Sequence, residues 1–255
     1  MVIEASRSTI TAASAEIGRA KAAAAADAGL AIALQSLVSG GVQGEIPLDG
    51  RVRHVRFDDA DLAIAIEDEQ GKVPLNAIDE EQARRLFTAM GVTGDRLDIL
   101  TDSFLDWLDE DDSPRPSGAE ADYYAPLDIH PRNGMLRSVA ETGLIRGFDP
   151  ALVDRLEAVA TVHFGRGPFK PEHASPIAIG VMEGEDQGAV DLLNRQRALA
   201  GQETALSTES ASTLVGRPVT VRIEASRADG AQARLRQIIV LTGRRDMPYM
   251  LRERY

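Results

Sequence analysis

Carboxylates are concentrated in one short stretch of this chain. From Leu105 to Asp128 there are eight acidic residues and a single basic one, Arg115. Carboxylate oxygens crowded on an irregular loop either remain in solvent or bind a hard cation such as Ca²⁺, which takes about six to eight oxygen ligands in flexible geometry. The residues alone leave both alternatives open.

The spacing inside this loop partly matches the calcium loop of EF-hands. If Asp109 occupies the first position, Asp111 falls on the third and Glu120 on the twelfth, which are ligand positions. Pro114 stands where that loop requires glycine, so the segment is not an EF-hand, although a calcium loop of another shape fits the same oxygens. The candidate metal ligands are Asp106, Asp109, Asp111, Glu120 and Asp122.

Catalytic chemistry finds little support. The chain has no cysteine, which excludes disulfides, thiolate zinc sites and cysteine nucleophiles. Its four histidines lie far apart without metal-ligand spacing, and no P-loop, G-x-S-x-G or H-E-x-x-H motif occurs. We therefore predict no catalytic residue and no enzyme activity. A calcium-dependent hydrolase is the first alternative, and it would need a carboxylate pair that nothing in the sequence selects.

A nucleic-acid-binding module is the second alternative. The segment 138–162 resembles a helix–hairpin–helix, with one glycine, Gly147, in the turn, and a basic face around Arg146 and Arg155 would support that function. The formal net charge of −12 argues against it, because binding to nucleic acid relies on Lys and Arg replacing condensed counterions.

The first element that these sites require is a long helix. Residues 2–38 are rich in alanine and contain no proline, and a narrow apolar seam recurs at every seventh position. Such a helix lies on its own sheet or is shared with partner helices, and the two are compatible. We predict that Ile3, Ile10 and Ile17 project beyond the folded body and contact partner helices. The seam continues through Ala24, Ala31 and Val38.

The remaining periodicity predicts an α+β fold. Residues 51–57 and 62–69 alternate as strands, the pattern turns helical after Asn76, and residues 218–225 and 231–242 form a second hairpin. We expect a pilin-like long N-terminal helix on an antiparallel sheet with a large all-helical insertion. The expected boundaries are 1–76 for the first part of the sheet domain, 77–200 for the insertion and 201–255 for the last strands.

Four segments in fixed order carry a resemblance to a known family. They are residues 68–76 (DEQGKVPLN), 106–111 (DWLDED), 118–124 (GAEADYY) and 131–141 (PRNGMLRSVAE). In this order they resemble the minor pseudopilin K family of the type II secretion system, and with the alanine-rich helix and the last strands the likeness covers nearly the whole chain.

The resemblance implies a structural protein without catalytic activity. Such a protein sits at the tip of a periplasmic pseudopilus with the minor pseudopilins I and J, primes its assembly and thereby supports protein export across the outer membrane. Family members bind calcium, which favours Ca²⁺ as a structural cofactor of the acidic loop. The family is anchored in the cell inner membrane by an apolar N-terminal helix behind a short leader. We expect that segment to lie outside this chain, because no apolar run here approaches the roughly 20 residues that span a bilayer.

Overall fold

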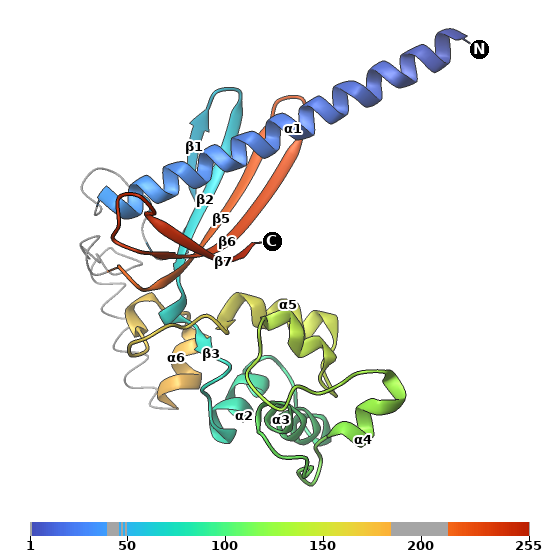
Figure 1. Ribbon diagram of the computed structural model, residues 1–255, viewed down its shortest axis with the longest axis vertical. Coiled ribbons are helices and arrows are strands. Elements are labelled where there is room, and N and C mark those ends of the chain that lie inside the picture. Colours follow the sequence, from blue (N-terminus) through green and yellow to red (C-terminus); the bar gives the residue numbers. More distant parts are fainter. Residues whose placement is uncertain (1, 40–45, 47, 49, 185–213, 255) are drawn as a thin grey trace. The chain divides into compact units, whose positions relative to one another are not determined.

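The computed structural model describes residues 2–39, 46, 48, 50–184 and 214–254, with side chains of the first helix from Ala12 to Val38. The chain forms two compact units. The sheet unit consists of Met1–Glu69 with Thr204–Tyr255, and the helical unit consists of Gln70–Glu203. Figure 1 shows the elements of both. The sequence pattern also predicts a helix at 185–199 and a loose polar segment at 202–212, and both lie outside the described residues.

The sheet unit contains a five-stranded antiparallel sheet in the order β1-β2-β5-β6-β7. Strand β2 pairs with β5 along its whole length, from Ala60↔Arg227 to Asp68↔Val219. The helical unit is therefore inserted between two neighbouring strands of one sheet, which confirms the predicted fold. The strands are β1 (Arg53–Phe57), β2 (Ala60–Asp68), β5 (Pro218–Arg227), β6 (Gln232–Leu241) and β7 (Tyr249–Arg254).

Helix α1 (Val2–Ser39) lies along one face of this sheet, as Figure 1 shows. Its small residues allow close approach: a Cβ added at Gly29 would lie 2.9 Å from Cγ2 of the buried Ile223. The buried positions follow helical spacing, so they form one continuous stripe against the strands. They are Ala22, Ala25, Ala26, Leu30, Ala33 and Leu37.

The predicted seven-residue seam is not the stripe that faces the sheet. Ile17 and Val38 are more than half exposed, and Ala24 and Ala31 are exposed too. The helix does lie on its own sheet, as expected, but through a different face. Alanine occurs on every side of α1, so the sequence pattern could not distinguish which of its apolar stripes is buried.

The helical unit is built from short helices and one minimal parallel ladder. Asp79 caps α2 through a reciprocal bond with Gln82, and Asp149 caps α5 with Pro150 at the first helical position, as predicted. The ladder joins β3 (Val73–Pro74) to β4 (Ala160–Thr161). The helices are α2 (Glu80–Ala89), α3 (Asp95–Leu108), α4 (Ala121–Tyr124), α5 (Pro150–Val159) and α6 (Pro176–Glu183), with 3₁₀ turns at Glu69–Gly71, Ala125–Leu127, Val139–Leu144 and Pro171–His173.

The residues from Ser138 to Glu141 have the sequence pattern of a capping box, of which half is formed. Ser138 Oγ accepts from the Glu141 N–H at 3.2 Å, but the Glu141 carboxylate accepts from the N–H of Arg137 instead of returning to Ser138. The segment that follows is a short 3₁₀ helix, Val139–Leu144. Glu141 is drawn away from the cap because Arg132 and Trp107 donate to the same carboxylate.

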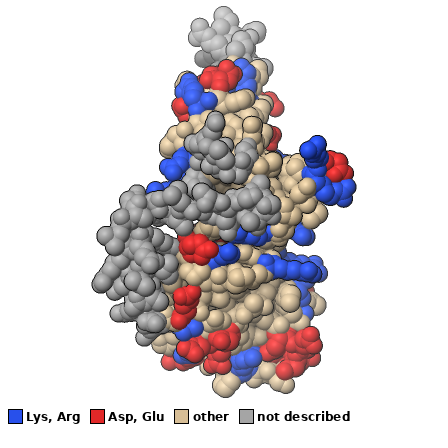
Figure 2. Space-filling model, turned by 90° about the vertical axis from the view of Figure 1, so that its left-hand side faces the viewer, with Lys and Arg blue, Asp and Glu red and all other residues tan. Residues whose placement is uncertain are grey.

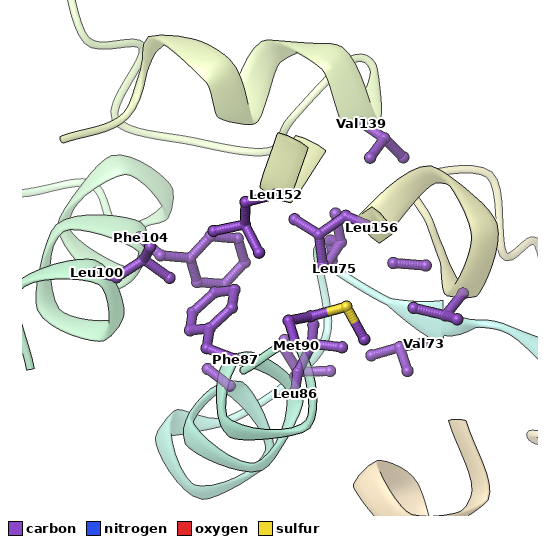
Figure 3. Close-up of a cluster of buried hydrophobic side chains, with 14 of the residues drawn as sticks. Val73, Leu75, Leu86, Phe87, Met90, Leu100, Phe104, Val139, Leu152 and Leu156 are labelled. Carbon is purple, nitrogen blue, oxygen red and sulfur yellow. The ribbon is translucent and has the colours of Figure 1, made fainter. Parts of the chain in front are cut away.

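The core of the helical unit is aromatic at its centre. Phe87 packs edge-on against Phe104 with 5.5 Å between ring centroids and against Phe148 at 5.6 Å. Figure 3 shows Phe87 and Phe104 among Leu152, Leu156 and their aliphatic neighbours. The sequence is poor in aromatic residues, and this unit gathers them where α2 and α3 meet the turn that precedes α5.

Candidate cation site and exposed helix face

The acidic loop that follows α3 folds around Asp106. This carboxylate is fully buried and accepts from the N–H of Ala119 at 2.9 Å and from the N–H of Arg115 at 3.2 Å. The approach is so close that a Cβ at Gly118 would lie 1.8 Å from Asp106 Oδ2. A glycine is thus required at position 118, inside the third segment of the resemblance.

Arg115 supplies the counter-charge for this buried carboxylate. Its Nη1 donates to Asp106 Oδ1 at 2.7 Å and to Asp109 Oδ2 at 2.6 Å. Burial alone would lower the pKa of Arg115, but the two carboxylates raise it above its ordinary value. The single basic residue of the loop therefore stays charged and joins the end of α3 to the middle of the loop.

Glu120 has no such counter-charge. Its side chain is buried, with the residue 5% exposed, and neither carboxylate oxygen has a hydrogen-bond partner in the described structure. Burial, followed by the charges of Asp106, Asp109 and the neighbouring Asp112 and Asp111, raises the pKa of Glu120 to about 7. A buried carboxylate without a partner is costly, and the ordinary solutions are protonation or a bound cation.

The five predicted ligands do not converge on one point. Asp106 and Asp109 are engaged by Arg115, Asp111 accepts from the N–H of Ser113 at 2.8 Å, and Asp122 is exposed on α4. Among the residues that the structure describes, no three carboxylates or histidines are grouped as a bound metal ion would require.

Two residues of this set nevertheless have buried oxygens that no protein group engages in the described structure. Three buried oxygens have no hydrogen-bond partner, namely both of Glu120 and Oδ1 of Asp109. The negative charges of these two carboxylates repel each other. Carboxylate oxygens on an irregular loop are the donors that Ca²⁺ prefers. Sequence reasoning named these residues but missed the isolation of Glu120, which depends on the fold of the loop and has no local signal.

The four segments of the resemblance form one connected network around this loop. Trp107 packs edge-on against Tyr124 at 5.3 Å, and Tyr124 Oη accepts from the N–H of Arg146 at 3.1 Å. Asn76 exchanges two hydrogen bonds with the backbone of Leu136, at 3.0 and 2.8 Å. The shared sequence pattern therefore encodes the packing of the acidic loop on the core.

The first segment also contributes outside the helical unit. Asp68 pairs with Arg217 at the end of β2, and Glu69 accepts from Thr220 Oγ1 at 2.6 Å within the sheet unit. Gly71 allows a backbone crossing in the helical unit, since a Cβ there would lie 2.5 Å from the carbonyl oxygen of His173. These polar residues thus have structural roles, and none of them is arranged as a nucleophile with a base.

Arg146, named for a nucleic-acid-binding face, is engaged internally. Its guanidinium lies 4.8 Å from the ring centroid of Tyr123 and donates to the carbonyl oxygen of Gly118 at 2.9 Å. The helical unit holds 24 acidic and 13 basic residues, whereas the rest of the chain holds 16 and 15. Acidic groups gather on the face of this unit that is visible at the foot of Figure 2.

Helix α1 presents the second candidate site. The β5–β6 turn contacts the helix at Gly18, where a Cβ would meet Ala231 at 3.2 Å, and residues 12–17 before it are exposed. Ile17 therefore lies beyond the end of the sheet, with 58% of it exposed. Ile3 and Ile10 belong to the same helix, but their side chains lie outside the described residues.

By length and composition alone, α1 is also long and apolar enough to span a membrane. The segment Ala12–Val38 has a mean hydropathy of 1.2, although 44% of the scored window is buried inside the protein. The expectation that no run of this length occurs was therefore wrong. Alanine gives the helix its apolar average, and a core helix satisfies the same criterion, so this observation is weak evidence for membrane insertion.

Comparison with known proteins agrees with the motif order. Residues 57–164 match the family model of type II secretion system (T2SS) protein K. Type II secretion system protein K of Dickeya chrysanthemi is 38% identical over 73 residues, a segment that spans 29% of this chain and 20% of that relative.

The fold has a solved counterpart. A chain in the crystal structure of the GspK-GspI-GspJ complex from the enterotoxigenic Escherichia coli type 2 secretion system matches with a TM-score of 0.58, covering 98% of both chains at 17% identity. At this identity the likeness concerns the fold alone. Over residues 57–164 the chain is thus similar to the type II secretion system protein K family, in agreement with the resemblance that its four motifs predicted.

Proposed function

We propose that this protein is a non-enzymatic minor pseudopilin that assembles with pseudopilins of the I and J types at the tip of the type II secretion pseudopilus. The observation that carries the proposal is the exposed apolar face of α1. An apolar stripe of this length in water is normally covered by a partner, and its small residues allow another helix to approach closely.

The proposed partner surface contains Ile3, Ile10 and Ile17. Replacing all three by Ser should weaken co-purification with I-type and J-type pseudopilins at least about tenfold, because burying three isoleucines contributes on the order of 5 kcal/mol before entropic losses. The melting temperature of the isolated protein should hardly change, since Ile17 contacts solvent and not the sheet.

A matched variant with Leu at the same three positions keeps the apolar area and should retain the complex. If the Ser variant unfolds the isolated protein, the seam belongs to its own core. If both variants bind partners equally well, the interface lies elsewhere on the chain.

The proposed location is the periplasm, with the full-length protein anchored in the inner membrane. What supports it is the match of residues 57–164 to the protein K family model and an N-terminal helix of apolar composition. Fractionation of cells that make the full-length protein should place it with inner-membrane proteins.

The second part of the proposal is a structural calcium ion on the acidic loop. Glu120 and Asp109 would hold it through their unpaired oxygens, and the neighbouring Asp111 and Asp112 would add negative charge. The ion would supply the counter-charge that Glu120 lacks and join the two ends of the loop. Because the loop is irregular and rich in oxygens, we expect Ca²⁺ to bind in preference to Mg²⁺, which demands strict octahedral geometry.

Calorimetric titration of EDTA-treated protein tests this part. Calcium should bind with a measurable heat and raise the melting temperature, whereas magnesium at the same concentration should do neither. The double variant Asp109→Ala with Glu120→Ala should lose both effects. Absence of heat with calcium, or an unchanged melting temperature, would overturn the calcium site.

A further inference from the structure

We infer that Arg115 is an internal counter-ion that competes with a divalent cation for the acidic loop, so that the loop folds without the cation but binds it more weakly. The inference rests on the proposed calcium site and assigns a role to the one basic residue inside it. It concerns how this chain's own residues set the affinity of that site.

The two carboxylate oxygens of Asp109 have different environments, and this difference is the basis of the proposed competition. Oδ2 accepts from Arg115 Nη1 at 2.6 Å, whereas Oδ1 is buried and has no partner in the described structure. A cation that uses Asp109 together with Glu120 must therefore share this carboxylate with a guanidinium. Two positive charges on one carboxylate repel each other, and solvent screens this repulsion only in part, because the Arg115 side chain is 34% and the Asp109 side chain 29% exposed.

Arg115 also gives the buried Asp106 a counter-charge from within the loop. Asp106 is fully buried, and a buried carboxylate requires an opposite charge and hydrogen bonds. Arg115 supplies the charge through Nη1 at 2.7 Å, and the N–H groups of Arg115 and Ala119 supply the bonds. Asp106 is thereby satisfied and has no need of a metal ion.

The negative charge of Glu120 is the one that Arg115 does not neutralise. Arg115 carries one positive charge, and both of its contacts go to Asp106 and Asp109. Glu120 receives no hydrogen bond from it, although the three carboxylates interact electrostatically. Arg115 therefore neutralises two of these three carboxylates, Asp106 and Asp109. A divalent ion that neutralises Glu120 must bind close to the positive charge of Arg115.

Removing the charge of Arg115 tests the inference with two readouts of opposite sign. The variant Arg115→Gln keeps a planar group that donates hydrogen bonds but has no charge. In EDTA its melting temperature, followed by the fluorescence of Trp107, should fall by about 5 °C. In a calorimetric titration its calcium affinity should rise about tenfold or more over the unsubstituted protein.

The matched control is Arg132→Gln. Arg132 is another arginine of the helical unit that pairs with a carboxylate, Glu141, at 3.1 Å. Its loss should lower the melting temperature while the calcium affinity stays within about threefold of the original, a difference below 1 kcal/mol. A rise in affinity for both variants would reflect only the change in net charge and would overturn the inference.

The outcomes separate the inference from the calcium proposal. If the unsubstituted protein binds calcium and Arg115→Gln binds it no better, Arg115 does not compete and the inference fails alone. If only Arg115→Gln binds, Arg115 fully excludes the ion and the inference stands. If neither protein binds calcium, both fail.

The variant remains informative if it unfolds in EDTA. If calcium then refolds the variant, the cation has replaced Arg115 as the counter-ion of the loop, which supports the inference. A variant that stays unfolded at about 10 mM calcium, well above the affinities of weak calcium modules, overturns the inference, because the fold would then need Arg115 in a way that a cation cannot replace.

Discussion

The indole Nε1 of Trp107 donates a hydrogen bond to Oε1 of Glu141 at 3.2 Å, across 34 residues of chain. The two residues belong to different segments of the family pattern, and both segments border the acidic loop. Glu141 also accepts from Arg132 at 3.1 Å and from the N–H of Arg137 at 2.9 Å. The nearly buried carboxylate of Glu141 thus holds the segment 132–141 against the end of α3.

Glu141 should make the helical unit sensitive to acid. Burial raises its pKa, but the bonds from Arg137, Arg132 and Trp107 outweigh burial and hold the pKa below its ordinary value. A carboxyl group with a depressed pKa stabilises the folded state above its unfolded pKa, and this contribution is lost as the pH falls through the folded pKa. Glu141→Gln should therefore cost about 1–3 kcal/mol at pH 7 and much less at pH 3.

The measurement is urea unfolding followed by the fluorescence of Trp107, the single tryptophan of the chain. A suitable control is Asp128→Asn on the exposed surface, where a left-handed backbone with φ 56° tolerates either residue. It should change stability by less than about 0.5 kcal/mol at either pH. Equal losses for Glu141→Gln at pH 7 and pH 3 would contradict the assignment of its charge.

Asn76 should matter because both polar atoms of its amide are used. Nδ2 donates to the carbonyl of Leu136, and Oδ1 accepts from the N–H of the same residue. Asn76→Ala leaves two backbone groups without partners and should destabilise the helical unit by about 2–4 kcal/mol. Asn76→Asp retains only the acceptor and places a negative charge near the carbonyl oxygen of Leu136. It should therefore lose at least as much free energy of unfolding as Asn76→Ala does. A loss below 1 kcal/mol in chemical unfolding would mean that solvent replaces the amide.

Much of the fold could be predicted because its signals are local. Asp79 and Asp149 cap the helices that follow them, and the pattern around Gly230 predicts the β5–β6 hairpin. The switch from strand to helix periodicity after Asn76 marks the insertion, although the two compact units divide earlier, between Glu69 and Gln70.

The rest depends on contacts between distant residues. The β3–β4 ladder joins two-residue strands that are too short to show any periodicity, and alanines on all sides of α1 hide which face meets the sheet. The candidate ligands could be named from their type and spacing. That Arg115 neutralises Asp106 and Asp109 but leaves Glu120 unpaired follows only from how the loop folds.

The contact between α1 and β5 should not tolerate a larger residue at Gly29. A methyl group there would meet Ile223, which is buried on the sheet and has no room to move. Gly29→Ala gains about 1 kcal/mol of helix propensity but should lose about 1–3 kcal/mol to overpacking, for a net destabilisation of the sheet unit in calorimetry. The same change at Gly180 in α6, where a Cβ would meet nothing within 4 Å, should be neutral or stabilising. A stabilised Gly29→Ala would show that the helix lies farther from the sheet.

Gly118→Ala is the sharpest test of the acidic loop itself. The new Cβ would lie 1.8 Å from Asp106 Oδ2, and neither group has freedom to retreat. Asp106 is fully buried and accepts from the N–H of Ala119, one residue beyond the substitution.

Relief of this clash requires the loop to detach from Asp106, which leaves that carboxylate buried without its hydrogen bonds. The expected cost is about 3–5 kcal/mol, typical of a broken buried charge pair. Urea unfolding followed by Trp107 fluorescence should show it, and a glutamate-specific protease should cleave after Glu120 sooner, because the detached loop exposes this buried residue.

Gly134→Ala is the matched control on a neighbouring segment. Gly134 donates its N–H to the carbonyl of Trp107, and the nearest atom to an added Cβ is a carbonyl oxygen at 3.9 Å. It should therefore preserve both stability and resistance to the glutamate-specific protease. If Gly118→Ala behaves like this control, Asp106 does not hold the loop, and Arg115 and Glu120 cannot have the opposed environments from which the cation site was argued.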